Sequence, residues 1–276
     1  MGSININITL VAFVVVSITY VIKEVWRPEI LRRGAVAIFV AAFLLNTILV
    51  VNRWTEAGHA PFSNLYESLV FYAWSVGFAY LVLEYLYGLR IVGALSAVMI
   101  MLLLLYASTT DETIKPLMPA LQSNWLTIHV VTYFIGYGAL GISFITALLF
   151  LGSWMRSGKN PGETTLGFEK LSYKIVAFGF PFLTLGLVTG AVWANKAWGT
   201  YWSWDPKETW SLITWLIYLG YLHLPLALPR MNIDKAKIPL IQSTCLVMAF
   251  LAVVFTYLGL AYLPSASDSE HIYGNK

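Results

Sequence analysis

The sequence is poor in charged residues and has almost no cysteine. Only 11% of its 276 residues are Asp, Glu, Lys or Arg, whereas a soluble globular domain usually carries about 25%. A large soluble core cannot explain this deficit, because a domain of this length still has a surface to solvate. The single cysteine, Cys245, excludes a disulfide within the chain and a CxxC redox pair. The net charge of +3 is too small and too dispersed to indicate a nucleic-acid partner.

The N-terminal apolar stretch also lacks the marks of a cleavable signal peptide. No basic region precedes it, and no small-residue cleavage site follows it. We therefore expect this stretch to be the first membrane span.

Long apolar runs are abundant, since 58% of the residues are hydrophobic. A helix needs roughly 20 apolar residues to cross a bilayer. The runs are continuous rather than alternating, which favours helices over a barrel. We predict an all-α, polytopic helical bundle that forms one membrane domain over residues 1–276. About eight transmembrane helices are expected, at Ile6–Ile22, Ala35–Val51, Glu67–Tyr87, Ile91–Ser108, Trp125–Met155, Leu171–Val192, Glu208–Leu228 and Pro239–Leu263.

Basic residues are unevenly divided between the two sets of connections. Of the 17 Lys and Arg residues, only Arg53, Lys115, Lys196, Lys207 and Lys276 fall on the side that carries the chain termini. The other connections carry the remaining twelve. By the positive-inside rule, both termini face the outer, periplasmic or lumenal side.

Tryptophan is concentrated in one segment, WANKAWGTYWSWDPKETWSLITW, from Trp193 to Trp215. Six of the eleven tryptophans lie here. An interfacial aromatic belt is the ordinary explanation, but a belt would scatter aromatic residues over all spans. Large, rigid indoles on a constrained loop would instead form an apolar platform for a planar ligand. We predict an external cofactor-binding loop over residues 193–210, with Trp193, Trp198, Trp202, Trp204 and Trp210 as its binding residues.

The start of the seventh helix is specified by a capping box in this segment. Asp205 occupies the N-cap, Pro206 the first helical position and Glu208 the third. These acidic residues are therefore expected to be anchors of the loop, and no catalytic residue is assigned. We expect Gly190 and Gly199 to help fix the path of the loop.

The four histidines differ in their expected depth. His129 lies one turn into the fifth helix and His271 in the external tail, both on the side of the tryptophan segment. His223 lies inside the seventh helix, roughly 20 Å along its axis from Trp210, at an intramembrane depth where an ionisable group is costly. Neutral imidazole is a good axial ligand for haem iron. His59 lies in a turn-rich external loop, where a structural role is expected.

Several strings resemble one family of haem-handling membrane proteins. The tryptophan segment is similar to the WWD signature shared by the CcmC, CcmF and CcsA (ResC) proteins of cytochrome c maturation. GHAPFSNLYESLVFYAWS, LQSNWLTIHV, TWLIYLGYLHL and HIYG resemble the CcsA family in particular, and the length and span count agree with it. The resemblance runs from about Arg53 to Gly274.

The resemblance implies a function in cytochrome c biogenesis. Such a protein carries haem b (iron protoporphyrin IX) from the inner to the outer face of the membrane. There the haem is presented for thioether attachment to the CxxCH motif of apocytochrome c, the chain being part of a holocytochrome c synthase (haem lyase) complex. His129 and His271 would ligate iron at the outer site. His223 would supply half of a deeper site, completed by a CcsB/ResB-like membrane subunit. The membrane would be a bacterial plasma membrane or a thylakoid.

Three other functions are compatible with parts of this pattern. A haem transporter without synthase activity would need the same two sites. A cytochrome b that keeps its haem usually stacks paired histidines in facing spans, whereas only His223 is truly intramembrane here. A structural subunit with an aromatic belt would carry no haem at all.

Overall fold

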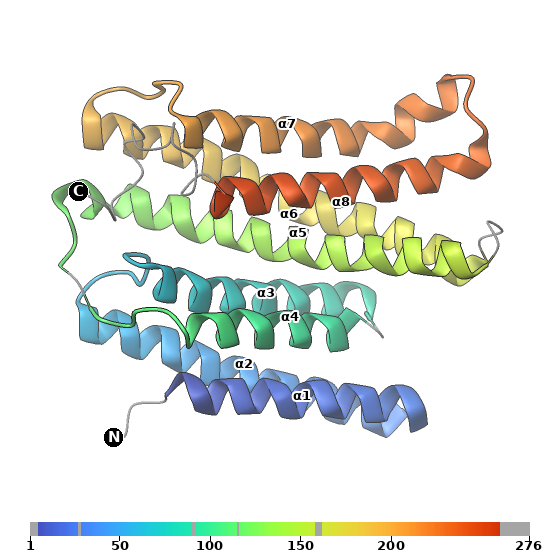
Figure 1. Ribbon diagram of the computed structural model, residues 1–276, viewed down its shortest axis with the longest axis horizontal. Coiled ribbons are helices and arrows are strands. Elements are labelled where there is room, and N and C mark those ends of the chain that lie inside the picture. The colour runs from blue at the N-terminus through green and yellow to red at the C-terminus, as the bar shows by residue number, and fades with distance from the viewer. Residues whose placement is uncertain (1–4, 27–28, 90–91, 115, 158–161, 260–276) are drawn as a thin grey trace. The chain divides into compact units, whose positions relative to one another are not determined.

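The computed structural model describes residues 5–26, 29–89, 92–114, 116–157 and 162–259. Over these residues the chain forms eight α-helices and three short 3-10 turns, as Figure 1 shows. The helices are α1 (Ile6–Trp26), α2 (Glu29–Ala57), α3 (Leu65–Tyr87), α4 (Val92–Ala107), α5 (Asn124–Arg156), α6 (Glu163–Trp198), α7 (Pro206–Ala227) and α8 (Ile238–Tyr257). The predicted all-α class and the number of helices are confirmed.

Six of these helices are long and apolar enough to cross a membrane, judged by length and composition. They are α2 from Arg33, α3, α5, α6, α7 with its following turn, and α8 with its preceding turn. Two further helices are apolar but shorter, namely Ile6–Ile22 of α1 and Val92–Ala107. The chain is therefore a polytopic membrane protein.

Helix α6 is longer than the sequence predicted. The expected span was Leu171–Val192, but the helix runs from Glu163 to Trp198. Our boundaries followed the apolar stretch, whereas a helix continues through polar residues until a residue interrupts it. Gly199 ends α6 in the left-handed conformation, with φ of 85°, and its N–H bonds the Asn195 carbonyl.

The chain packs as two compact units. The first unit contains α1 to α4 and Tyr137–Ile142 of α5. Its core is aromatic: the ring of Phe39 contacts those of Phe13, Tyr20 and Tyr80, all of which are buried. Because every one of these rings is almost fully buried, this core fixes how α1, α2 and α3 pack within the unit.

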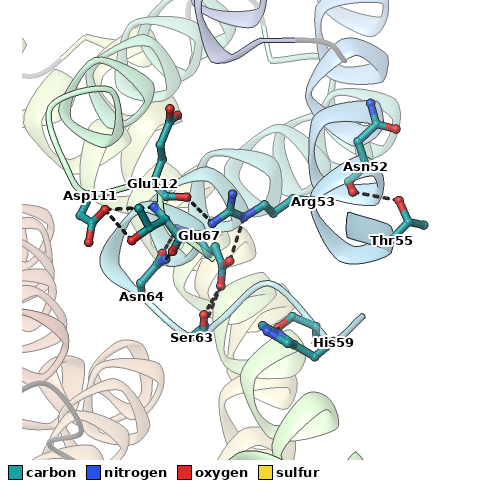
Figure 2. A network of polar contacts seen from close by, with 11 residues as sticks. Asn52, Arg53, Thr55, His59, Ser63, Asn64, Glu67, Asp111 and Glu112 are labelled. Carbon is teal, nitrogen blue, oxygen red and sulfur yellow. Dashed lines mark hydrogen bonds and ion pairs between the residues drawn. The ribbon is translucent and has the colours of Figure 1, made fainter. Parts of the chain in front are cut away.

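A buried ion pair ties together the connections at one end of this unit, and Figure 2 shows its surroundings. The Glu67 carboxylate is fully buried and accepts from Arg53 Nε at 2.8 Å. Its other oxygen accepts from the backbone N–H and the hydroxyl of Ser63, at 2.8 and 2.7 Å. Arg53 also donates to the Glu112 carbonyl at 2.6 Å. The Arg53–Glu67 pair thus joins the end of α2, the 58–64 connection and the segment after α4.

The second unit contains the rest of α5 with α6, α7 and α8. Its helices are joined by short polar contacts between buried or half-buried side chains. The hydroxyls of Thr146 and Ser172 lie 2.7 Å apart across α5 and α6, and Trp215 Nε1 of α7 donates to Thr184 Oγ1 of α6 at 2.9 Å. Such contacts are typical of helices that pack inside a membrane. Every described member of the predicted site belongs to this unit.

Candidate functional site

The tryptophan segment consists of two helix ends and a short link. Trp193 and Trp198 belong to the last turns of α6, residues 199–205 form the link, and Trp210 lies in the second turn of α7. In Figure 1 the link lies at the same end of the second unit as the start of α5. The indoles of Trp193 and Trp198 are therefore held by helical backbone, and those of Trp202 and Trp204 by the link.

The link is fixed at both ends. Gly199 caps α6, and the capping box predicted at α7 is present: Asp205 accepts from the Lys207 N–H at 2.7 Å, and Glu208 accepts from the Asp205 N–H at 3.3 Å. Glu208 also accepts from the Ser203 N–H at 2.8 Å. Asp205 and Glu208 are only 7% and 8% exposed. Their expected role as anchors of the loop is confirmed.

Trp204 has an unusual backbone conformation. Its φ of 61° is the only positive value at a non-glycine residue among the described residues. A bulky side chain in this region is strained, and such strain persists only where surrounding contacts impose it. The indole is 68% exposed and meets Trp202 edge to face, with ring centroids 5.8 Å apart. The fixed link thus holds a large apolar ring out from the protein surface.

His129 is held in a defined tautomer by α6. Its Nδ1 lies 2.8 Å from the Gly186 carbonyl oxygen. A carbonyl can only accept, so Nδ1 carries the proton and the lone pair is on Nε2. The imidazole stacks on Trp193, with centroids 6.0 Å apart and planes 19° apart. Trp193 is 2% exposed and meets Trp198 edge to face at 4.8 Å. His129, Trp193 and Trp198 therefore form one continuous cluster.

Two glycines of α6 make room for this cluster. A Cβ at Gly190 would lie 2.5 Å from both Cε1 and Nδ1 of His129, and one at Gly186 would lie 2.5 Å from Tyr133. Gly190 was expected to shape the loop, and that expectation is wrong: it lies eight residues before the helix end and forms the surface on which the imidazole rests. The spacing Gly-x-x-x-Gly is a known signal for close helix packing that our sequence interpretation missed.

This close approach gives a testable prediction. We expect Gly190→Ala to displace the His129 ring and to lower the unfolding free energy of the purified protein by about 1–3 kcal/mol, the usual cost of overpacking. The measurement is denaturant titration in detergent. Gly167→Ala is the matched control, because nothing lies within 4 Å of a Cβ added at that position of the same helix. Equal unfolding free energies for the two variants would contradict the prediction.

His223 lies farther along α7 (Pro206–Ala227), near its end. It is 13 residues beyond Trp210, about 20 Å along α7 at 1.5 Å per residue. The side chain is exposed, and Nδ1 lies 2.7 Å from the Leu219 carbonyl oxygen. Nδ1 therefore carries the proton, and Nε2 has the lone pair. The imidazole as a whole lies on the surface of the unit.

The remaining predicted residues have other positions. His271 lies outside the described residues. Trp210 meets Phe255 of α8 at 4.4 Å, so its ring also serves helix packing. His59 Nδ1 lies 3.0 Å from the neighbouring Ala60 carbonyl oxygen, and its loop is tied down through Glu67. Within the described part of the chain, no three His, Cys, Asp or Glu residues gather as a metal site, although a haem iron needs only one or two protein ligands.

Comparison with known proteins places this arrangement in one family. Residues 62–266 match the Cytochrome C assembly protein family. The chain is 40% identical over 241 residues to cytochrome c biogenesis protein CcsA of Chlamydomonas reinhardtii, covering 84% of this chain and 65% of that protein. It is 33% identical over 298 residues to CcsA of Guillardia theta, covering 97% and 95%.

The fold is also found in a solved structure. The cytochrome c haem lyase CcmF aligns with a TM-score of 0.63 at 18% identity, covering 92% of this chain and 45% of CcmF. With the family match over most of the chain and CcsA relatives at 33% to 40% identity, the chain belongs to the Cytochrome C assembly protein family and, within it, to the CcsA proteins.

Proposed function

We propose that this chain carries haem from the inner to the outer face of a membrane and presents it for attachment to apocytochrome c. The relatives are named cytochrome c biogenesis proteins, and the structural neighbour is named a haem lyase. Thioether formation requires the haem vinyl groups to meet the thiols of a CxxCH motif. The chain contributes binding and orientation, and the thiolates of the apocytochrome are the nucleophiles.

The observation that carries this proposal is the state of His129. Its Nδ1–H is committed to the Gly186 carbonyl, so Nε2 has the lone pair that an iron ligand requires. The imidazole also lies against Trp193, an apolar surface suited to a flat porphyrin. His271 would be the second axial ligand of this outer site. Indoles would support the porphyrin from the link and its flanks, namely Trp193, Trp198, Trp202, Trp204 and Trp210.

His223 would hold haem at the deeper position. Its imidazole is on the exposed face of α7, where a histidine of a second subunit could approach it. We propose a CcsB/ResB-like membrane subunit as that partner. The iron would then have two imidazole ligands, one from each subunit, because this chain offers a single histidine at that depth.

We further propose eight transmembrane helices with both termini on the outer side. The two shorter apolar helices, α1 and α4, would then span as well, and the basic residues would favour the inner face. The membrane is a bacterial plasma membrane or a thylakoid, in keeping with CcsA relatives from the cyanobacterium Microcystis aeruginosa and the alga Chlamydomonas reinhardtii.

The test is reconstitution in a host that lacks its own cytochrome c maturation. The full chain is expressed with a CcsB-type subunit and an apocytochrome, and covalently bound haem is measured by haem stain and by mass spectrometry of the thioether peptide. We expect thioether formation with the wild type and at least a tenfold loss with His223→Ala. Haem bound to the complex without thioether formation would favour the alternative, a haem transporter without synthase activity.

A further inference from the structure

Lys196 lies on α6 near the place where His129 of α5 contacts that helix. Trp125 lies one helical turn before His129 on α5, and Lys196 lies three residues after Trp193 on α6. Lys196 Nζ lies over the Trp125 ring, 5.9 Å from its centroid. Two contacts therefore follow one another where α5 meets α6. The His129 imidazole stacks on Trp193, and one turn away the Lys196 ammonium lies over Trp125.

The charge of Lys196 is not neutralised within the described residues. No carboxylate among them lies within ion-pair distance of its exposed amine. The two acidic residues that follow Lys196 most closely in the sequence accept from backbone N–H groups: Asp205 from that of Lys207 and Glu208 from that of Ser203. Lys196 thus offers a cation, beside His129, to an anion that comes from outside the chain.

Haem b carries two propionate side chains, which are ionised at neutral pH because carboxylic acids titrate near pH 4. We propose that the Lys196 ammonium binds a haem propionate when His129 holds the iron. This inference rests on the proposed function and deepens it, because it names the group that sets the orientation of the porphyrin in its plane. An iron ligand alone leaves that orientation free, whereas thioether formation needs each vinyl group directed to its own thiol.

The contact with Trp125 makes Lys196 suited to binding a propionate. Ordering a free lysine side chain costs about 1.5–2 kcal/mol of rotamer freedom. The contact with the indole restricts the side chain before the ligand arrives, so that less of this freedom is lost on binding. A propionate and the indole can share the ammonium, because an aromatic face leaves other N–H groups of the amine available.

The experiment compares two porphyrins that differ only in the propionates. The purified full-length chain is titrated with iron protoporphyrin IX and with its dimethyl ester, and the ratio of the two dissociation constants is measured by absorbance. Lys196→Gln removes the charge, and Lys196→Arg keeps it. Lys170→Gln is the matched control, since it removes an exposed lysine from the opposite end of α6.

We expect the wild type to prefer the diacid, and Lys196→Gln to reduce that preference about threefold to fivefold, the size expected of one exposed ion pair. Lys196→Arg and Lys170→Gln should keep it. An unchanged preference in Lys196→Gln, or no preference in the wild type, would overturn the inference while leaving the proposed function intact. Porphyrin binding that His129→Ala does not alter would overturn the proposed function and this inference together.

Discussion

Replacing His129 with alanine is expected to reduce covalent haem attachment at least tenfold in the reconstituted system. The substitution removes the imidazole that we propose as an axial ligand, and this imidazole is also the ring that stacks on Trp193. Mutating a residue that hydrogen-bonds to a metal ligand typically lowers metal affinity by about 10–100-fold, and loss of the ligand itself should exceed the low end of that range. The measurement is haem stain per apocytochrome.

One further variant and one chemical rescue make this result specific to the imidazole. Ile128→Ala is the control, because Ile128 neighbours His129 in α5 but is 45% exposed, and it should retain attachment. Exogenous imidazole should restore part of the activity of His129→Ala, since it can enter the space that the side chain leaves. Wild-type attachment by His129→Ala without added imidazole would show that this residue is not an iron ligand.

The second large effect is expected at Glu67. Glu67→Ala leaves the Arg53 guanidinium without its carboxylate and removes the acceptor of two Ser63 donors. Breaking a buried ion pair by removing one partner costs about 3–5 kcal/mol. We expect a loss of that size in the unfolding free energy of the purified protein, measured by denaturant titration in detergent.

The controls separate the buried pair from charge in general. Glu56→Ala removes an exposed carboxylate from the last turns of α2, where exposed charges contribute about 0–1 kcal/mol. The double variant with Arg53→Ala should be less damaging than the sum of the single variants, because the orphaned charge is then absent. A loss for Glu67→Ala no larger than that for Glu56→Ala would contradict the role of the network.

Short sequence patterns predicted the features that are determined by residues close together in the chain. The Asp205-Pro206-Lys207-Glu208 string specified the start of α7, and the structure has that capping box. Apolar runs predicted all eight helices, because lipid leaves few other folds for such runs. The predicted end of α6 came several residues too early. Hydropathy indicates only the part of a helix that lies in the bilayer, and a helix can extend beyond that part.

Contacts between distant segments were beyond the sequence interpretation. The sequence predicts that Gly190 helps to fix the path of the loop, because nothing in its neighbourhood indicates that the His129 imidazole lies on it. The Arg53–Glu67 pair is 14 residues apart across a connection, and the Trp125–Lys196 contact joins two long helices. Each depends on the rotation of one helix against another, which single-sequence periodicity leaves open when a helix is apolar on all sides.

We propose that His129 is an axial ligand of haem beside the tryptophan segment, and that His271 is the second. The most direct measurement is the absorption spectrum and haem stoichiometry of the purified wild type, His129→Ala and His271→Ala. We expect the spectrum of an iron with two imidazole ligands in the wild type, and an altered spectrum with less haem per protein in each variant. Wild-type absorption and stoichiometry in both variants would contradict it.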